Sequence, residues 1–446
     1  MRILIISKYF PPENSIASLR PYSWAKYWSR EGHDVTVLTT PKKVLPESLT
    51  LDCSSFSVVE VRYRSLFYTF KNFYKNCLNK KSSEDINITD EKESYKVQSY
   101  TSYLKRSLQK IDGFRVNRGI FITARMPDIT DLWINPATNW AKKQGNWDLV
   151  VSTHGPYACH IVAHNLKKSN KVQFWIADFR DLWTDNHIYK GVFPFTLLEK
   201  RIEKKAISQA NAITTVSKPL AATLANKYGK EKTFVVENGF DSEDLTSILK
   251  TPIFNDNKIR IVYTGTIYKG KQDPSPLFES IFELAHSDIN NLNLLDKLEV
   301  LFVGPTSSLV LEMANAVEVT KWVKASSLLP RSDVLRMQRD ADALLFLEFD
   351  NGKTDGILTG KLFEYLNSST EIWGIGVSEN SAPGKIILEA RAGKIFGKDK
   401  SLIKKELIRL LSNQKNKNLD LNNEFIKSFE RKHLAESMLK IVNKNV

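Results

Sequence analysis

The sequence is poor in cysteine, with only Cys53, Cys77 and Cys159 among its 446 residues. These three lie far apart and form no CxxC pair, so neither a disulfide framework nor a zinc site is predicted. No apolar run approaches the roughly 18 residues of a membrane span, and the opening MRILIIS is too short for a signal peptide. We therefore expect a cytoplasmic protein, either soluble or peripheral at the inner face of the plasma membrane.

Several catalytic motifs are also absent. The loop after the first apolar run reads KYFPPENSIAS, so the G-x-G-x-x-G fingerprint of dinucleotide-binding enzymes is missing where it should stand. No Walker A, HExxH or GxSxG sequence occurs. These absences argue against NAD enzymes, P-loop enzymes, zincins and serine hydrolases.

What the chain does have is length, apolar content and positive charge. Its 446 residues, 42% of them hydrophobic, suffice for two domains of about 200 residues each. Lys and Arg number 64 against 50 Asp and Glu, a net charge of +14. This excess favours an anionic partner, such as nucleic acid, phospholipid headgroups or a phosphorylated substrate, and general solubility is the alternative.

Strand-like and helical segments alternate along the chain, which predicts parallel sheets covered on both faces. The first set of strands is expected at 3–6, 34–38, 58–61, 148–152, 172–176 and 212–216. The pattern begins again after a linker at 241–258, with strands at 259–263, 298–303 and 343–347. We expect an α/β protein with an N-terminal Rossmann-like domain, 1–245, that carries an insertion at about 62–120. A C-terminal one, 246–422, and a helix over 423–446 that packs back on the first domain would follow.

The segment 62–81, RYRSLFYTFKNFYKNCLNKK, does not fit the alternation. It contains six basic residues, no acidic ones and six Tyr or Phe. Such a helix suits an anionic membrane surface, where each cation adds roughly 1 kcal/mol near the headgroups. The alternative is a core-facing helix whose lysines are solvated.

The stretch 354–376, TDGILTGKLFEYLNSSTEIWGIG, carries the most chemistry. Thr359 and Gly360 stand at a helix start, where free backbone N–H groups and the helix dipole favour a phosphate. Lys361 and Glu364 share one face of that helix, because they are three residues apart. The pair suits a nucleoside diphosphate, the lysine meeting the diphosphate and the carboxylate accepting from the ribose diol. An ordinary intrahelical ion pair is the alternative.

Two further segments sit at the carboxyl ends of predicted strands, where open α/β sheets bind ligands. In 263–273, Gly265 permits close approach of a ligand, and Lys269 or Lys271 can reach a diphosphate. The segment 323–340, which includes Leu328, is predicted as a loop entering a Pro-started helix and as a wall against a nucleobase.

In this order and spacing, the segments resemble the retaining, GT-B-fold glycosyltransferases of family 4, particularly bacterial enzymes of surface-polysaccharide assembly. The resemblance covers nearly the whole chain except most of 62–120. It rests on KYFPPENSIASLR with WSREGHDVTVLTT, WIADFRDLW, AISQANAITTVSKPLAATL, VVENGFD, YTGTIYKGKQDPSPLFESI and TDGILTGKLFEYL.

The resemblance implies that Glu364 holds the donor ribose and that Lys361 or Lys271 holds the diphosphate. Gly265 and Thr266 would line the same cleft. This chain has Thr266 where many relatives have an arginine, and the lysines would then neutralise more of the diphosphate. A second carboxylate is usual seven residues before the ribose-binding one; here Ile357 stands there and Asp355 is the nearby acid.

In the first domain, His154 and the run Asp178-Phe-Arg-Asp181 follow two predicted strands directly, which places them on the rim of the cleft. Members of the family often place a histidine near the donor sugar, so His154 is our catalytic candidate; a capping or loop-packing histidine is the alternative. Asp178, Arg180 and Asp181 would bind the acceptor or position its hydroxyl, unless they form an Asp–Arg network that fixes the loop. Glu13, Ser15 and Arg20 are further candidates on the acceptor side.

These expectations describe a sugar transfer from a nucleoside-diphosphate sugar to a hydroxyl of a lipid-linked or saccharide acceptor, with retention, in bacterial surface-polysaccharide synthesis. Cationic side chains would take the place of a metal ion, so neither a metal nor a further cofactor is expected. Two alternatives remain: a nucleotide-sugar epimerase of the same fold, and a non-catalytic protein that binds anionic surfaces. We expect no nucleic-acid partner, because the lysines are spread along the chain and no recognised motif is present.

Overall fold

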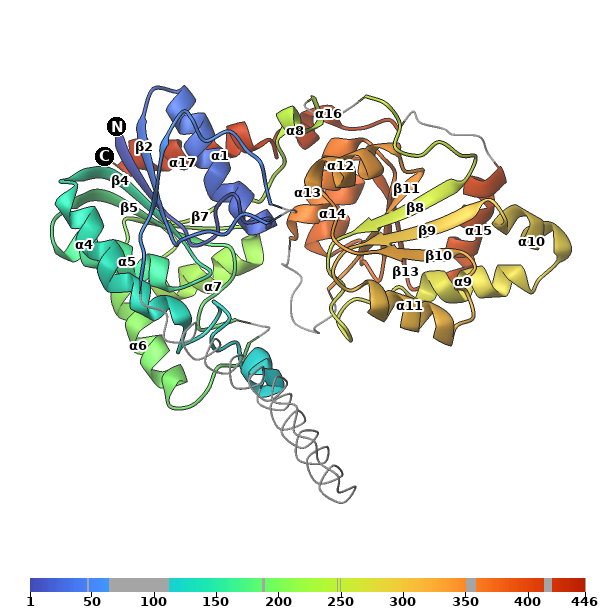
Figure 1. Ribbon diagram of the computed structural model, residues 1–446, viewed down its shortest axis with the longest axis horizontal. Helices are drawn as coiled ribbons and strands as arrows, with labels where there is room; N and C mark the ends of the chain where they lie inside the picture. The colour runs from blue at the N-terminus through green and yellow to red at the C-terminus, as the bar shows by residue number, and fades with distance from the viewer. Residues whose placement is uncertain are drawn as a thin grey trace, which may run out of the picture.

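The computed structural model describes residues 1–45, 48–63, 112–186, 189–246, 248, 250–349, 358–412 and 419–445. Within them the chain forms two α/β domains, each built on its own parallel sheet (Figure 1). The predicted class of two Rossmann-like domains facing each other is thereby confirmed. The segment 62–81 lies outside the described residues from position 64 onward, as do Asp355 and Ile357.

The N-terminal domain has a seven-stranded sheet in the order β3-β2-β1-β4-β5-β6-β7. Its strands are β1 (Arg2–Ile6), β2 (Asp34–Thr39), β3 (Ser57–Glu60), β4 (Trp147–Thr153), β5 (Val172–Phe179), β6 (Ala212–Thr215) and β7 (Thr233–Val235). Its helices are α1 (Ile16–Arg30), the 3-10 turn η1 (Ile129–Trp133), α4 (Ile134–Lys143), α5 (Ala158–Lys168), α6 (Phe195–Ile207) and α7 (Lys218–Tyr228). Because β1 pairs with both β2 and β4, the strand order reverses there, which is the place where open α/β sheets bind ligands.

The C-terminal domain has a six-stranded sheet in the order β10-β9-β8-β11-β12-β13. Its strands are β8 (Ile259–Thr264), β9 (Leu298–Val303), β10 (Val323–Ser326), β11 (Ala343–Leu347), β12 (Ile372–Ile375) and β13 (Gly393–Gly397). Its helices are α9 (Ser275–Ala285), α10 (Ile289–Leu295), α11 (Ser307–Ala316), α12 (Arg331–Asp340), α13 (Gly360–Ser368), α14 (Ala382–Glu389) and α15 (Lys400–Ser412). Here the reversal lies at β8, which pairs with β9 on one side and β11 on the other.

The expectation of a loop from residue 323 is wrong, because Val323–Ser326 forms β10, parallel to β9. The expectation of one helix over 423–446 is also wrong. The chain forms α16 (Asn423–Lys427) and α17 (Arg431–Asn445) instead. The break has a tertiary cause: Phe240 donates its N–H to the Phe429 carbonyl, and Arg431 donates its N–H to the Phe240 carbonyl. These bonds hold 429–431 against the segment that leaves the first domain.

The last helix packs on the first one. The indole N–H of Trp28 donates to the Ala435 carbonyl at 3.0 Å, and Ala435 and Met438 belong to the same core as Trp24 and Trp28. Figure 1 shows α17 beside α1 in the N-terminal domain, whereas α15 lies in the C-terminal domain. The chain therefore crosses between the two domains twice. Among the described residues, no helix is both long enough and apolar enough to span a membrane.

Candidate functional site

Two glycines end neighbouring strands of the C-terminal sheet and bring three segments together. Gly265, with φ +116°, follows β8, and Gly304 follows β9. A Cβ on Gly304 would lie 2.2 Å from the carbonyl oxygen of Gly265, so a side chain there is excluded. A Cβ on Gly265 would lie 3.1 Å from Cε of Lys361. The start of α13 therefore lies directly over the carboxyl end of β8.

Lys361 is the buried cation of this edge. Its side chain is 8% exposed, and its ammonium lies 3.5 Å from the centre of the Tyr263 ring. Burial lowers the pKa of the Lys361 ammonium to about 7, and the neighbouring Glu364 carboxylate offsets part of that effect. An incoming diphosphate would supply the negative charge that this site lacks and would favour the protonated lysine.

Glu364 does not pair with Lys361 but with Arg331, whose Nη1 donates to its Oε1 at 2.5 Å. The carboxyl group is 6% exposed. Burial alone would raise its pKa, but the Arg331 guanidinium lowers it below the usual range. Glu364 is therefore an ionised acceptor held in one orientation, as recognition of a ribose hydroxyl requires.

Arg331 and its second partner were missed by the sequence reasoning. Arg331 is the first residue of α12 and follows Pro330, inside the segment predicted as a wall against a nucleobase. The Pro-started helix was the one feature of the sequence that could have pointed to Arg331. Nη2 of Arg331 also donates to Asp244 at 2.7 Å, and Asp244 lies within the predicted linker. No feature of the linker sequence distinguishes Asp244, because the contact joins positions 87 residues apart.

The start of α13 presents polar groups that lack partners. Thr359 is its N-cap residue, and its Oγ1 is buried with no hydrogen-bond partner among the described residues. Gly360 follows, and a Cβ there would lie 2.4 Å from Cγ2 of Ile16, at the start of α1. The N-terminus of α13 therefore meets the N-terminal domain and offers its free N–H groups to an anion at that junction.

The other predicted donor side chains lie around this edge and are half-buried or exposed, unlike the buried side chains of Lys361 and Glu364. Thr266 is half-buried, and its carbonyl accepts from the Tyr263 hydroxyl at 2.8 Å. Lys269 and Lys271 are exposed in the loop between β8 and α9. Leu328 is 54% exposed between β10 and α12. Five of the nine donor candidates therefore form one compact cluster, namely Gly265, Thr359, Gly360, Lys361 and Glu364.

His154 follows β4 and is buried, with 2% of it exposed. Its ring stacks on Phe179 and Trp183, with centroids 5.8 and 6.3 Å away. Burial, together with the neighbouring His160, lowers the pKa of His154 well below its ordinary value, so the imidazole is neutral. A neutral imidazole at the end of a strand is compatible with a catalytic histidine and equally with a histidine that packs or caps the loop.

Asp178 is fully buried and is bound by Arg20, with Oδ1 2.7 Å from Nη2 and Oδ2 3.2 Å from Nε. The hydroxyls of Thr153 and Thr214 also donate to it. Its four contacts fix the ends of β4, β5 and β6 to α1 and leave no exposed surface for an acceptor. This corresponds to the Asp–Arg network considered as the alternative, with Arg20 as the partner in place of Arg180.

Replacement of Asp178 by Ala should lower the free energy of unfolding by about 3–5 kcal/mol, because it leaves the Arg20 guanidinium buried and unpaired. Arg20 holds the pKa of Asp178 below the unfolded value of about 4. The contribution of ionised Asp178 to stability is therefore complete above the unfolded pKa of about 4 and is lost as the pH falls through the lower pKa of the folded protein. Urea unfolding at pH 7 measures the change. Asp34→Ala, at an exposed carboxylate 3.8 Å from Arg2, is the control and should change stability by less than about 1 kcal/mol.

Arg180 and Asp181 lie on the rim beyond Asp178. Arg180 donates to the His154 carbonyl at 2.8 and 3.1 Å, which fixes the loop, while Asp181 is exposed. Burial raises the pKa of the Tyr268 phenol in the loop after β8, and the Asp181 carboxylate and Tyr9 raise it further. Asp181 of the N-terminal domain therefore lies near Tyr268, in the same loop of the C-terminal domain as Lys269 and Lys271.

The remaining candidates of the first loop have structural partners. Glu13 forms ion pairs with Lys8 at 2.9 Å and Lys42 at 3.1 Å. Burial would raise the pKa of Glu13, but these two lysines lower it. Ser15 caps α1 by accepting from the Ala17 N–H at 3.2 Å. Both contacts shape the loop that faces the C-terminal domain.

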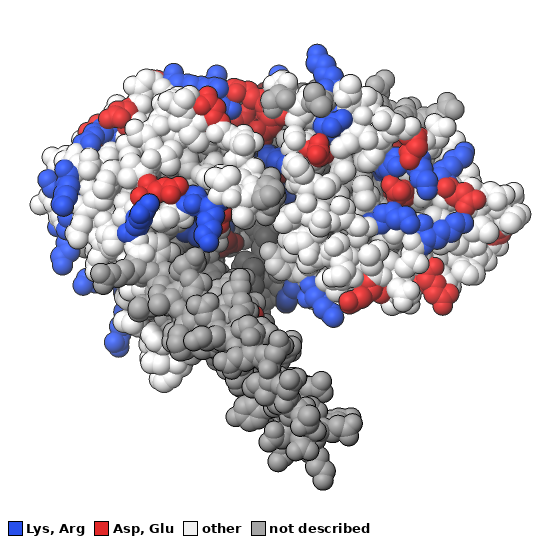
Figure 2. Space-filling model, in the orientation of Figure 1, with Lys and Arg blue, Asp and Glu red and all other residues white. Residues whose placement is uncertain are grey.

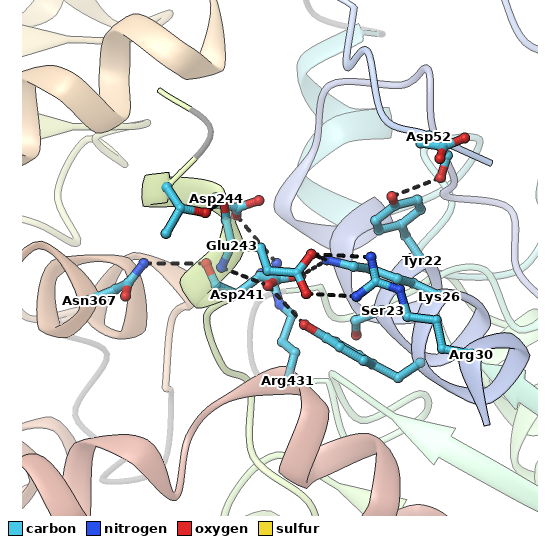
Figure 3. A network of polar contacts seen from close by, with 12 residues as sticks. Tyr22, Ser23, Lys26, Arg30, Asp52, Asp241, Glu243, Asp244, Asn367 and Arg431 are labelled. Carbon is cyan, nitrogen blue, oxygen red and sulfur yellow. Dashed lines mark hydrogen bonds and ion pairs between the residues drawn. The ribbon is translucent and has the colours of Figure 1, made fainter. Parts of the chain in front are cut away.

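A polar network ties the first crossing between the domains to α1 (Figure 3). The expected linker contains a short helix, α8 (Ser242–Thr246). Asp241 accepts from Lys26 at 2.7 Å and from Tyr27 at 2.9 Å, and Glu243 accepts from Arg30 at 2.6 Å. Since Asp244 binds Arg331, an unbroken set of contacts leads from α1 through α8 to Glu364.

Comparison with known proteins finds a family model that matches part of this chain. Residues 92–244 match the model of Glycosyltransferase Family 4. No curated protein sequence matches the chain.

Solved structures match over the whole chain. An α,α-trehalose-phosphate synthase (UDP-forming) from Burkholderia xenovorans, in complex with glucose-6-phosphate, has a TM-score of 0.59 at 10% identity over 98% of this chain and 99% of its own. The lipopolysaccharide outer core galactosyltransferase WaaB has a TM-score of 0.56 at 11% identity over all of both chains. A protein from Listeria monocytogenes assigned as a UDP-N-acetylglucosamine 2-epimerase has a TM-score of 0.54 at 13% identity over 99% and 95%. At such identities the likeness shows the fold, which is the expected GT-B arrangement.

Proposed function

We propose that this chain is a glycosyltransferase that moves a sugar from a nucleoside-diphosphate sugar to the hydroxyl of a saccharide or lipid-linked acceptor. The proposal is supported by the GT-B fold and by the match of residues 92–244 to the model of Glycosyltransferase Family 4. The observation that carries the donor assignment is the cluster of Lys361, Glu364, Gly265 and Thr359 at one strand end. These residues supply a cation, an ionised carboxylate, backbone that a ligand can approach closely and the N–H groups of a helix start.

The donor would lie with its ribose against Glu364 and its diphosphate against Lys361 and the N-terminus of α13. During transfer the bond between the anomeric carbon and the diphosphate oxygen breaks, the acceptor oxygen forms the new bond to that carbon, and the proton of the acceptor hydroxyl passes to the departing diphosphate. Negative charge builds up on the leaving diphosphate, and the Lys361 ammonium and the N–H groups after Thr359 would stabilise it. We propose that these groups act without a metal ion and that the anomeric configuration is retained.

The acceptor would enter from the N-terminal domain, where the exposed Asp181 carboxylate lies near Tyr268 of the loop after β8. The trehalose-phosphate synthase binds glucose-6-phosphate, and WaaB acts in the lipopolysaccharide outer core, so both suggest saccharide acceptors. A bacterial surface polysaccharide or its lipid-linked precursor is the acceptor class that we propose. Closing the cleft would exclude water and so limit hydrolysis of the donor.

An epimerase is the second candidate, because the Listeria monocytogenes protein has the same fold. A non-catalytic binder of anionic surfaces has less support. On the face shown in Figure 2, basic and acidic side chains alternate across both domains, so the positive charge is not gathered there into one patch.

A thermal-shift panel of nucleotide sugars tests the proposal, followed by incubation with the strongest binder. Binding to the folded state alone raises the melting temperature, by an amount that grows with ligand concentration. We expect the stabilising nucleotide sugar to yield the nucleoside diphosphate and a glycosylated product only when a saccharide or lipid acceptor is added. Isomerised nucleotide sugar in the absence of any acceptor would identify an epimerase instead.

A further inference from the structure

The N-terminal end of α6 exposes apolar side chains next to one another. Phe193 is 76% exposed, Leu197 53% and Leu198 46%. With Pro194 and Phe195 the two leucines line a shallow hollow, and Arg201 closes it. Single exposed apolar side chains are ordinary on a soluble protein, but a contiguous group around a hollow marks an interaction site.

The acidic and basic side chains of α6 lie on different sides of the helix, the acidic ones buried and the basic ones exposed. The acidic residues of α6, Glu199 and Glu203, are buried at 0% and 2% exposure. Glu199 forms an ion pair with Arg125 at 2.8 Å, and Glu203 accepts from Thr184. The sequence of α6 has two acidic residues against four basic ones, and in the structure both carboxylates are buried.

The basic residues of α6 and of the loop before it lie on the surface. They are Lys190, Lys200, Arg201, Lys204 and Lys205, all exposed. Residues 189–210 contain no acidic residue besides the two buried ones. Leu197, Arg201 and Lys205 are spaced by four, so apolar and cationic side chains share one stripe of the helix.

We propose that this face, residues 193–205, docks on an anionic lipid bilayer. Phe193, Leu197 and Leu198 enter the boundary between headgroups and acyl chains, while the cations of α6 meet the lipid phosphates. The combination is that of an interfacial amphipathic helix, in which apolar burial and electrostatic attraction act together. A bilayer fits this surface better than a protein groove, because the positive charge runs along the helix without an acidic counterpart.

The position of α6 is compatible with this docking. Figure 1 shows it at the lower margin of the N-terminal domain, away from the C-terminal domain. The proposal goes beyond the sugar transfer and does not depend on it, and it concerns residues other than 62–81. Docking through α6 would hold the acceptor side of the cleft near lipid-linked substrates.

The test is co-sedimentation of the full chain with vesicles of phosphatidylcholine, alone or with about one third phosphatidylglycerol. The variant Lys200→Gln/Arg201→Gln/Lys204→Gln/Lys205→Gln should lose most of the preference for anionic vesicles, about fivefold for each cation removed. The matched control Lys258→Gln/Lys297→Gln/Lys385→Gln/Lys398→Gln removes the same charge from exposed positions of the C-terminal domain and should bind like the wild type. Phe193→Ser/Leu197→Ser/Leu198→Ser should weaken binding to both vesicle types.

Three results would overturn the proposal. They are an absence of vesicle binding by the wild-type chain, equal losses in the two charge variants, and a change of oligomeric state in the apolar variant with unchanged lipid binding. The last would identify a contact between copies of the chain. Transfer to a soluble acceptor should be the same in all these variants, so failure of the docking and failure of the proposed function can be told apart.

Discussion

Replacement of Glu364 by Gln should weaken nucleoside-diphosphate binding about 10- to 100-fold. The reason is that a hydrogen bond to a charged group contributes about 1.5–3 kcal/mol, and the carboxylate is the ionised acceptor that the Arg331 guanidinium holds in place. Isothermal titration with uridine, guanosine and thymidine diphosphates measures the loss on whichever binds tightest to the wild type.

The control for Glu364→Gln is Glu371→Gln. Glu371 is also a largely buried glutamate bound by an arginine, with Arg409 at 2.7 Å, in the same domain. Each variant removes one of the two carboxylates bound by its arginine, so both should lose some stability, but only the change at position 364 should weaken nucleotide binding. Equal nucleotide affinity in the two variants would contradict the ribose assignment.

Replacement of Lys361 by Gln should lower the transfer rate about 100- to 1000-fold, the usual effect of removing one group that stabilises charge in a transition state. The ammonium lies at the junction of β8 and α13, where a departing diphosphate would develop its charge. Lys385→Gln, on the exposed side of α14, is the matched control and should keep the wild-type rate.

The affinity of the wild type for a nucleotide sugar should fall as the pH rises above 7, up to tenfold for each pH unit. The ammonium has a pKa of about 7 in the free protein, and the anionic ligand binds its protonated form. In Lys361→Gln this dependence should disappear.

The pKa of Lys361 in the folded protein lies below its value in the unfolded chain, so the charged lysine lowers the free energy of unfolding at pH 7 and below. This loss of stability is removed as the pH rises toward 10.5. The melting temperature of Lys361→Gln at pH 7 should therefore equal or exceed that of the wild type.

Much of the fold could be predicted because its long strands are continuous apolar runs. The run from Ile3 to Ile6, for example, is completely buried between layers of helices. The strands that the sequence did not reveal are short, as in β7 with three residues, or rich in glycine, as in β13. The interruption between α16 and α17 could not be predicted, because it depends on Phe240, nearly 190 positions earlier in the chain.

The donor cluster could be predicted from the sequence because Lys361 and Glu364 are three residues apart in one helix. Their immediate partners were not, since Arg331 and Asp244 come from separate elements. The same limit explains Asp178: a strand end predicted an exposed rim residue, but Arg20, 158 positions away, buries it. Short-range spacing predicts which side chains share a helix face, whereas burial and ion pairing depend on contacts between distant segments.

The most direct test of the donor assignment is a thermodynamic cycle between Glu364 and the ribose. The affinities of wild type and Glu364→Gln are measured for the nucleoside diphosphate that binds tightest and for its 3′-deoxy analogue. We predict that the wild type binds the analogue at least tenfold more weakly, while the variant binds both within about twofold, because the missing hydroxyl then has no charged acceptor. An equal ratio of affinities in the two proteins would show that Glu364 does not contact the ribose, and the proposed donor site would be wrong.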